Sequence, residues 1–233
     1  MLRLENVEAR QGGFGLEADF TLLEGARAAV LGPSGGGKST LLAVIAGFLK
    51  PTRGRVLWQG QDLGPLPPGK RPVSILFQDH NLFPHLSVFE NVGLGHDPRL
   101  RLDGRARRDV EAALERVGLG GMGARRPAEL SGGQMGRAAL ARVLMRARPV
   151  MLLDEPFAAL GPGLKAEMLQ LVREIVEETF ATLLLVTHDP EDARALEGVT
   201  LFVEAGRVLP PEDTDALFAN PPANLRAYLG QRA

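Results

Sequence analysis

The chain has 233 residues, of which 45% are hydrophobic and 24% charged, enough to bury a sizeable core in one large or two small domains. Its 27 basic and 28 acidic residues give a formal charge of -1, which supplies no overall positive field for holding a polyanion, so we expect no nucleic-acid partner. There is no cysteine, which excludes disulfides, thiolate metal sites and a thiol nucleophile. The longest apolar run, Leu41 to Leu49, is too short to span a bilayer, and the first residues lack the features of a secretory signal, so we expect a cytoplasmic protein.

The N-terminal region predicts an antiparallel β ribbon, then a strand, a loop and a helix. Apolar and polar residues alternate at Leu2 and Leu4 and again over 16–20, with glycines between them. The apolar residues Ala28–Leu31 predict a strand that ends at the glycine-rich run 32–37. Apolar residues then recur at helical spacing, at Leu41, Leu42, Ile45 and Leu49.

The rest of the chain alternates between predicted strands and helices. A helical pattern runs from about Pro84 to Arg148, and a long amphipathic helix carries Leu164, Met168, Leu171, Val172 and Ile175. The tail from Pro211 predicts two short helical segments. Strands alternating with helices imply a mostly parallel sheet covered on both faces. The further strands are expected at Arg55–Trp58, Val73–Phe77, Val150–Leu153 and Thr182–Val186.

The glycine-rich segment after the strand Ala28–Leu31 fits the phosphate-loop pattern of a glycine, four residues, then Gly-Lys-Ser/Thr. Glycines allow the backbone to close around phosphate oxygens, and the first N–H groups of the next helix point at the anion. Lys38 is expected to reach the β- and γ-phosphates, and the Ser39 hydroxyl to ligate Mg²⁺. The alternative, a chance glycine-rich turn, is disfavoured by the flanking strand and helix. The predicted binding residues are Gly32, Pro33, Ser34, Gly35, Gly36, Gly37, Lys38, Ser39 and Thr40.

Two carboxylates, Asp154 and Glu155, stand at the end of the buried strand Val150–Leu153. This is where a second Mg²⁺ ligand is expected in a phosphate-loop enzyme, and Asp154 would hold the metal directly or through water. Glu155 projects differently and is suited to polarise an attacking water as general base. The alternative is a strand-end pair used as a turn and helix cap.

A third motif, Leu130-Ser-Gly-Gly-Gln, could by itself be a serine N-cap followed by flexible glycines. The order of motifs is more specific: phosphate loop, Gln78 after a strand, this signature, the pair of carboxylates, then His188 after another strand. That order resembles the nucleotide-binding subunits of ATP-binding-cassette (ABC) transporters over nearly the whole chain. The signature begins a helix and so forms another anion site, made by Ser131, Gly132, Gly133 and Gln134.

The resemblance implies an ATP-hydrolysing homodimer in which two subunits lie head to tail with two ATP molecules at their interface. A single chain already has one phosphate cradle, so the signature most naturally serves the nucleotide of the partner chain. The resemblance gives Gln78 contacts to Mg²⁺ and the attacking water, and His188 contacts to the γ-phosphate and the catalytic region. The remaining histidines, His80, His85 and His96, have no metal-ligand companions and are expected to be surface or packing residues.

The family resemblance also implies a fold: an α/β phosphate-loop NTPase core with a mostly parallel sheet, an N-terminal antiparallel β subdomain and a helical insertion. We expect one ABC ATPase domain over 1–233. In it, 1–84 and 150–210 form the core with its β subdomain, 85–149 a helical subdomain and 211–233 a short helical tail.

Three positions depart from the family pattern. An aromatic residue usually stacks on adenine near the end of the first strand, where this chain has Gln11, with Phe14 as a shifted candidate. The loop after the catalytic glutamate commonly ends in Leu-Asp and crosses to the partner subunit, whereas Gly161 stands here. Met135-Gly136 follows the signature where longer polar residues are usual, and Gly136 weakens an early helical turn by roughly 0.5 to 1 kcal/mol relative to alanine. These departures concern coupling and rate rather than ATP binding.

The compact single cassette indicates transport, with integral-membrane permease subunits supplied separately and a solute-binding protein acting indirectly. The segments 71–78, 81–87 and 90–95 are most similar to the ATP-binding subunits of thiamine (or thiamine pyrophosphate) importers. The resemblance therefore implies a peripheral protein at the cytoplasmic face of the inner membrane. Importers of ferric iron, polyamines or another small solute remain alternatives, as does a nucleotide-gated interaction protein with little turnover. Apolar residues close after Gln78, at Leu82, Phe83, Leu86, Val88 and Phe89, are candidates for a groove that receives a short helix of the membrane subunit, with core packing as the alternative for at least half of them.

Overall fold

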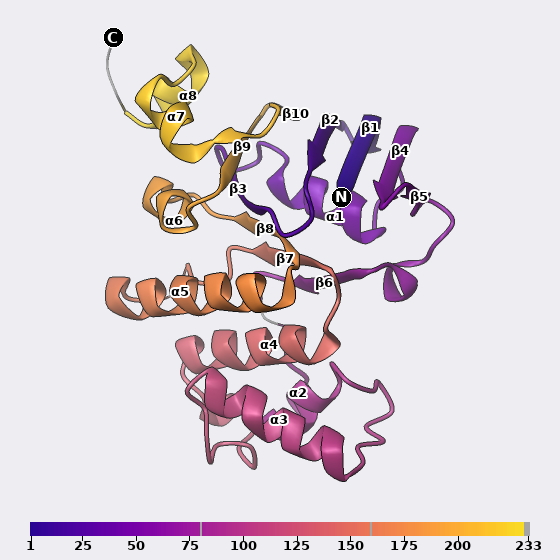
Figure 1. Cartoon of the computed structure of the whole chain (residues 1–233), viewed down its shortest axis with the longest axis vertical. Coiled ribbons are helices and arrows are strands. Elements are labelled where there is room, and N and C mark those ends of the chain that lie inside the picture. The colour runs from indigo at the N-terminus through magenta and orange to yellow at the C-terminus, as the bar shows by residue number, and fades with distance from the viewer. Residues whose placement is uncertain (80, 159, 231–233) are drawn as a thin grey trace.

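The computed structural model describes residues 1–79, 81–158 and 160–230 and contains one eleven-stranded sheet in the order β5-β4-β1-β2-β10-β9-β3-β8-β7-β6, with β11 paired to β9 (Figure 1). The strands are β1 Leu2–Gln11, β2 Phe14–Leu22, β3 Arg27–Leu31, β4 Arg53–Trp58, β5 Gln61–Asp62, β6 Val73–Leu76, β7 Val150–Asp154, β8 Thr182–Val186, β9 Val199–Glu204, β10 Arg207–Val208 and β11 Glu212–Asp213. The α-helices are α1 Lys38–Ala46, α2 Val88–Gly93, α3 Gly104–Arg116, α4 Gly132–Arg146, α5 Pro162–Thr179, α6 Pro190–Ala195, α7 Thr214–Ala219 and α8 Ala223–Tyr228, and short 3₁₀ turns lie at Pro68–Lys70 and Pro127–Glu129.

The sheet has a parallel part and an antiparallel part. Strands β9, β3, β8, β7 and β6 pair in parallel, while β5, β4, β1 and β2 form an antiparallel ribbon. The short strand β10 joins the two parts, since it pairs with β2 in parallel and with β9 antiparallel. The predicted α/β fold, with a parallel core and an N-terminal antiparallel region, is confirmed.

Alternate residues of the parallel strands enter two separate hydrophobic cores, as the period of two in a strand requires. On β3, Ala29 and Leu31 pack with helices α2 to α7, whereas Ala28 and Val30 pack with α1 and the antiparallel ribbon. Strands β7 and β8 divide their side chains in the same way. Both faces of the parallel sheet are therefore covered, which explains the near-continuous apolar strands in the sequence.

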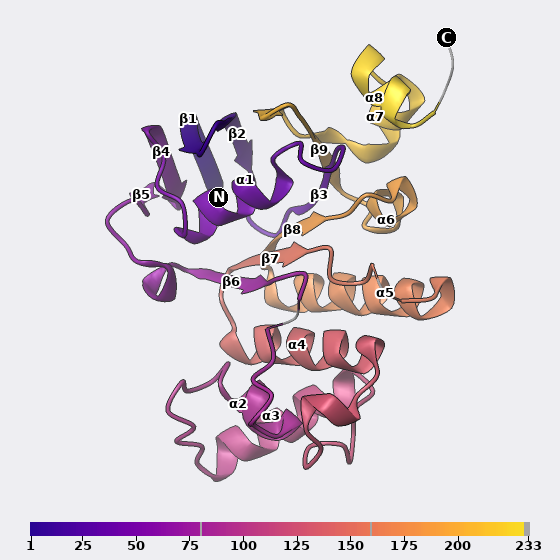
Figure 2. The same ribbon diagram turned by 180° about the vertical axis from the view of Figure 1, so that it is seen from behind.

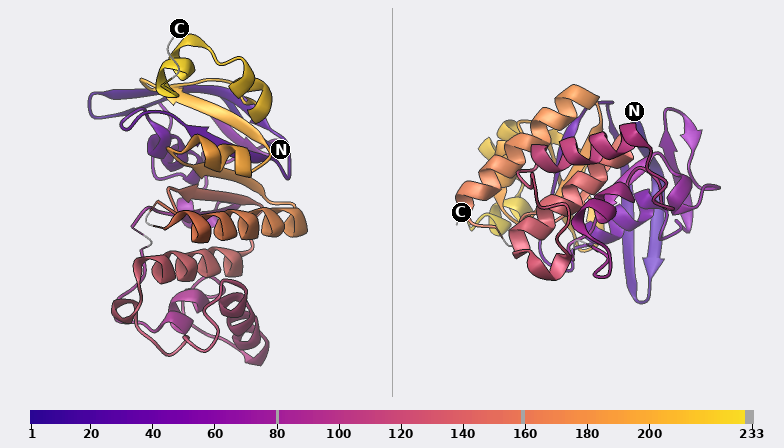
Figure 3. Two further views of the ribbon diagram at one scale, coloured as in Figure 1. Left: turned by 90° about the vertical axis from the view of Figure 1, so that its left-hand side faces the viewer. Right: turned by 90° about the horizontal axis from the view of Figure 1, so that it is seen from below.

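Helices α5, α4, α2 and α3 form successive layers on one side of the parallel strands (Figures 1 and 2). In Figures 1 and 2, α5 lies next to the parallel strands, α4 lies beyond it, and α2 and α3 occupy the far end. Helices α7 and α8 lie at the opposite end, near β9 and α6, as the left panel of Figure 3 also shows. Among the described residues, no helix is both long and apolar enough to cross a membrane.

Three details differ from the sequence predictions. Leu49 lies outside α1, because Gly47 adopts φ 88° and its N–H donates back to Ala43 and Val44, which ends the helix. Phe77 lies just beyond β6. Helix α6 and strand β9 are absent from the elements predicted above, although the run Val199–Glu204 is apolar enough to indicate a buried strand.

Candidate nucleotide-binding and catalytic site

The phosphate loop lies between β3 and α1 and depends on glycine at its first position. Gly32 has φ 149°, and a Cβ placed there would lie 1.9 Å from the carbonyl oxygen of Val203, so no other residue fits. Gly36 accepts a backbone hydrogen bond of 2.9 Å from Gly206, which ties the loop to the turn after β9. No side chain caps α1 at Gly37, so the N-terminal N–H groups of the helix remain directed into the loop. The loop thus has the backbone geometry of an anion cradle.

Lys38 is buried inside this loop. Its ammonium group donates to the carbonyls of Gly32 at 2.7 Å and Pro33 at 3.0 Å. Burial lowers the pKa of Lys38, and the carboxylates of Glu155 and Asp154 oppose that shift. A buried cation is thereby held inside the loop, where it could pair with a bound anion.

Asp154, the last residue of β7, is buried beside Ser39. Burial raises the pKa of Asp154, while a hydrogen bond from the Ser39 hydroxyl and the charge of Lys38 lower it. The hydroxyl and carboxylate oxygens converge and are hard ligands of the kind that Mg²⁺ takes alongside phosphate oxygens and water. No group of three or more His, Asp or Glu side chains that could hold a metal occurs among the described residues, so phosphate would have to complete this site. The donor set fits Mg²⁺ bound together with a nucleotide.

Glu155 follows directly and has a strained backbone, with φ 45°. Its N–H donates to the carbonyl of Val186, at 3.1 Å, which links the end of β7 to the end of β8. One Glu155 carboxylate oxygen lies 3.5 Å from Nδ1 of His188, whose side chain is 62% exposed. The predicted base and the predicted switch histidine are therefore neighbours.

A cavity of about 410 Å³ lies in front of the phosphate loop. It brings the predicted residues Gln78 and Glu155 together with the loop, although they follow different strands, β6 and β7. The Phe14 ring lies at its edge, since its outermost carbon would be 3.0 Å from a Cβ on Gly37. The cavity is lined by Gln11, Phe14, Ser34, Gly35, Gly37, Lys38, Ser39, Thr40, Gln78 and Glu155.

The signature forms the start of α4 and does not line that cavity. Ser131 is the N-cap: its side chain accepts from the Gln134 N–H at 3.3 Å, and the Gln134 side chain accepts from the Ser131 N–H at 2.9 Å. This capping box starts the helix at a fixed residue. Ser131 and Gly132 are exposed, so this helix N-terminus is open to a second molecule.

Gly161 is the N-cap of α5 and makes no side-chain cap. Among the residues that the structure describes, no atom lies within 4 Å of a Cβ built at this position, so a larger residue would fit there. His85 and His96 are exposed, and His80 lies outside the described residues.

The residues that hold the His188 turn were not predicted from the sequence. Lys165 of α5 forms ion pairs with Asp189 at 2.5 Å and Asp192 at 2.7 Å, and the Tyr228 hydroxyl donates to the His188 carbonyl at 2.8 Å. The Lys165 hydrogen bond holds the pKa of Asp189 below its usual range. The only sequence signal for any of them was the position of Asp189 next to His188.

Comparison with known proteins agrees with this geometry. The family model described as "ABC transporter" matches residues 16–158. The thiamine import ATP-binding protein of Cereibacter sphaeroides is 64% identical over 230 residues, which cover 99% of this chain and 100% of that protein. The thiamine import ATP-binding protein of a Ruegeria species is 56% identical over 230 residues, with the same coverage.

Solved structures give the same result. A dimeric ATP-binding cassette in a post-hydrolysis state, bound to ADP and Pi, has a TM-score of 0.82 at 31% identity, covering 92% of this chain and 99% of that one. A dimeric bacterial ABC transporter cassette matches with a TM-score of 0.82 and the same identity. The chain therefore belongs to the ABC transporter family, as one of its ATPase subunits.

Proposed function

We propose that this ATPase energises the import of thiamine or thiamine pyrophosphate. The observation that carries the ATPase part is the single cavity that the phosphate loop, Gln78 and Glu155 share. The assignment of the solute rests on the names of two relatives, which are 64% and 56% identical to this chain over nearly its full length. The cargo touches other subunits, so its identity is to be tested in the assembled transporter.

We assign each residue of the site a role in ATP hydrolysis. Lys38 and the loop N–H groups would bind the β- and γ-phosphates, and Ser39 and Asp154 would hold Mg²⁺, which would supply positive charge against the phosphates. Gln78 orients the attacking water, Glu155 accepts its proton, and His188 contacts the γ-phosphate from beside Glu155.

The active form is a head-to-tail homodimer. The signature helix start is exposed and lies outside the cavity of its own phosphate loop, so it would act as an anion site for the partner's ATP. Each of the two ATP molecules would then be held by one phosphate loop and one signature.

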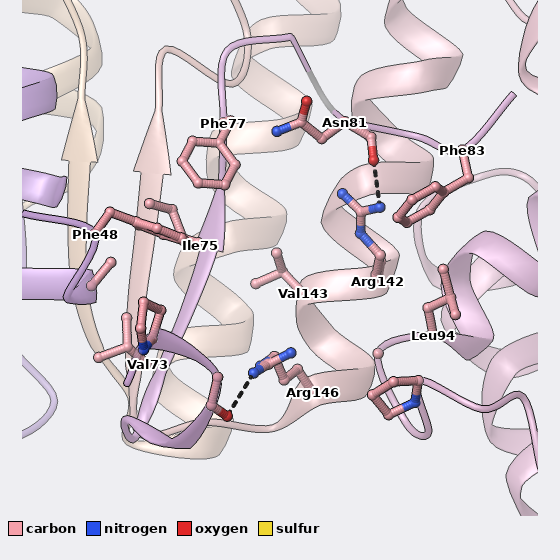
Figure 4. A pocket seen from close by; sticks show the side chains of 15 residues that line it. Phe48, Val73, Ile75, Phe77, Asn81, Phe83, Leu94, Arg142, Val143 and Arg146 are labelled. Atoms are coloured by element: carbon pink, nitrogen blue, oxygen red, sulfur yellow. Dashed lines mark hydrogen bonds between the residues drawn. The ribbon is translucent and has the colours of Figure 1, made fainter. Parts of the chain in front are cut away.

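The permease would dock in a groove of about 500 Å³ between the end of α1, strand β6 and helix α4 (Figure 4). Phe48 and Phe77 are in ring contact there, with centroids 5.6 Å apart, and Phe83 forms the opposite wall. Arg142 donates to the Asn81 carbonyl at 2.7 Å. An apolar groove of this kind accepts a short amphipathic helix.

This groove differs from the one expected from the sequence. Of the five apolar residues predicted for it, only Phe83 lines it. Val88 is fully buried, and Leu82 and Phe89 pack against the larger core, the one formed by Ala29, Leu31 and helices α2 to α7. The walls come instead from Phe48 and from residues on β6 and α4, which are distant in sequence.

We propose the whole chain as one ATPase domain with the boundaries given above, in which 85–149 is the helical subdomain and the groove for the permease lies between this subdomain and the core. The subunit would then lie at the cytoplasmic face of the inner membrane, as a peripheral protein.

Hydrolysis is tested by Glu155→Gln. The amide keeps the shape of the side chain but cannot accept a proton, so MgATP binding is retained, most turnover is lost, and ATP-dependent dimers accumulate. Lys38→Ala weakens ATP affinity itself. Undiminished steady-state turnover of Glu155→Gln would remove Glu155 from the role of base, and unchanged ATP affinity of Lys38→Ala would contradict the phosphate-loop assignment.

The composite site is tested by mixing two inactive chains. Ser131→Arg places a bulky cation at the signature, so the chain loads ATP but forms no sandwich. In a mixed dimer with Lys38→Ala, one of the two sites combines an intact loop with an intact signature and regains activity. Absence of any recovery in demonstrated mixed dimers would contradict the head-to-tail arrangement.

The solute is tested by isolating the permease with this subunit and reconstituting it with its solute-binding protein. Thiamine is expected to stimulate ATP hydrolysis, and ferric iron or a polyamine to have no effect. Stimulation of ATP hydrolysis by ferric iron or by a polyamine, without stimulation by thiamine, would show that the cargo is that solute instead.

A nucleotide-gated interaction protein with little turnover is the second candidate. It is favoured by Gly161, which offers no carboxylate to the partner subunit. The steady-state ATPase rate of the assembled complex separates the two functions.

A further inference from the structure

The C-terminal helix α8 reaches the turn that carries His188. The Tyr228 hydroxyl donates a hydrogen bond of 2.8 Å to the backbone carbonyl of His188, 40 residues earlier in the chain. Tyr228 is the single tyrosine of the chain. A segment outside the nucleotide-binding motifs therefore contacts the backbone of a residue next to Glu155.

Helix α8 is fixed where it makes this contact. Leu225 is fully buried in the larger core, and the Asn224 amide donates to the Glu204 carboxylate at 3.0 Å. The Tyr228 ring packs edge-on against Phe202, with centroids 5.6 Å apart. Glu204 and Phe202 both belong to β9, the neighbour of the strand that leads into the phosphate loop. The position of the Tyr228 hydroxyl is thus fixed by contacts between α8 and strand β9 of the sheet.

The residues on either side of His188 are held by a different set of contacts. The Thr187 hydroxyl donates to Asp192 at 2.6 Å and accepts from the Asp189 N–H at 3.1 Å. Lys165 binds Asp189 and Asp192. The Asp189 N–H and the His188 carbonyl belong to one planar peptide group, so Thr187 holds its N–H end and Tyr228 holds its carbonyl end. The orientation of that peptide group sets where the imidazole, 3.5 Å from Glu155, can lie.

We propose that Tyr228 is a positioning residue for ATP hydrolysis: its hydroxyl holds the His188 peptide group so that the imidazole stays beside Glu155. The inference rests on the proposed roles of His188 and Glu155. Burial raises the pKa of Tyr228, and the carboxylates of Glu155 and Asp189 raise it further. The hydroxyl therefore keeps its proton and remains a donor at neutral pH.

The test is Tyr228→Phe, which keeps the ring against Phe202 and removes only the hydroxyl. One hydrogen bond of ordinary strength corresponds to a drop in kcat of about three- to tenfold, with ATP affinity unchanged. The matched control is Thr179→Val, which removes a hydroxyl bonded at 2.7 Å to the Ile175 carbonyl in α5 and should leave kcat unchanged. Loss of ATP affinity in Tyr228→Phe, or an equal fall in kcat in the control, would overturn the positioning role.

A spectroscopic measurement reports on His188 directly. The chain has four histidines, so the His188 ring proton resonance can be assigned with the His188→Ala variant. Tyr228→Phe should shift that resonance and leave the His85 and His96 resonances in place. An unmoved His188 resonance would overturn the inference.

The double variant separates this inference from the proposed function. If Tyr228 acts through His188, Tyr228→Phe has no further effect on kcat in the His188→Ala background. Independent, additive losses would overturn the inference. Full turnover of His188→Ala would contradict the proposed role of His188, whereas loss in His188→Ala with full turnover of Tyr228→Phe would overturn only the role of Tyr228.

Discussion

Arg71 offers the sharpest test of how the phosphate-loop helix is held, because its guanidinium lies under the far end of α1. The side chain is 1% exposed. It donates to the carbonyls of Val44 at 2.9 Å, Ile45 at 2.8 Å and Leu66 at 3.1 Å. Two of these carbonyls belong to the last turn of α1, where helix carbonyls have no partner within the helix and a cation is favourable.

Replacing Arg71 by methionine keeps an apolar side chain of similar length and leaves the Ile45 and Leu66 carbonyls without their donor, while the Val44 carbonyl keeps the Gly47 N–H. Each unsatisfied buried group costs about 1 to 3 kcal/mol, or about 2 to 6 kcal/mol for two, but the variant also no longer buries a charge. The net loss in the free energy of unfolding is therefore about 2 to 4 kcal/mol, in the lower part of that range. For a chain of this size that lowers Tm by about 4 to 16 °C.

The assay is urea unfolding, followed by the fluorescence of Trp58 and by circular dichroism. Trp58 is the single tryptophan and is buried in the same core as α1. The control is Arg55→Met, since Arg55 pairs with Glu5 at 2.7 Å but is 61% exposed, a pair worth less than about 1 kcal/mol. If Arg71→Met unfolds within about 1 kcal/mol of the wild type, the guanidinium does not hold the helix as argued.

Three further predictions concern the site and its supports. Gly161→Asp should cap α5 and raise the Hill coefficient or the basal ATPase rate, whereas Gly161→Asn caps without a charge and should not; identical curves of rate against ATP concentration for both variants and the wild type would end the coupling argument. Phe14→Ala should weaken ATP binding about two- to tenfold in equilibrium titrations, and Gln11→Tyr should add little ATP affinity, because Phe14 already lies against the loop. Unchanged affinity in Phe14→Ala together with a gain in Gln11→Tyr would show that adenine does not stack on Phe14. Lys165→Met should lower the free energy of unfolding at neutral pH, and the difference from the wild type should shrink as the pH falls below about 3.9, because the lowered pKa of Asp189 stabilises the fold only while that group is ionised; a difference independent of pH would contradict this linkage.

The secondary structure around the proposed phosphate loop could be predicted from the sequence because it is local. The phosphate loop needs a strand, six loop residues and a helix in immediate succession, and the spacing of Gly32 and Lys38 carries all of that information. The predicted end of α1 was wrong because the apolar period continues to Leu49, whereas the helix ends at Gly47, where the backbone enters the left-handed region. The spacing of apolar residues does not indicate where a glycine ends a helix.

The parts that could not be predicted depend on contacts between distant segments. The groove near α4 takes Phe48 from the end of α1, and the bond from Tyr228 to His188 spans 40 residues. Phe14 follows the same rule: the hairpin register that pairs it with Gln11 is local, but its contact with Gly37 exists only after the ribbon has packed on α1. No pattern along the chain encodes such a contact.

The distance between Glu155 and His188 is set by sheet register rather than by either motif. In the parallel pair β7–β8, Asp154 lies opposite Val186, and the Glu155 N–H donates to the Val186 carbonyl. Glu155 is therefore the first residue beyond one strand and His188 the second beyond the next, which leaves their side chains 3.5 Å apart. A slip of one residue would turn the side chains of β8 to the opposite core, which its alternating burial in two cores forbids. The same apolar packing that stabilises the sheet thus fixes the geometry of the proposed catalytic pair.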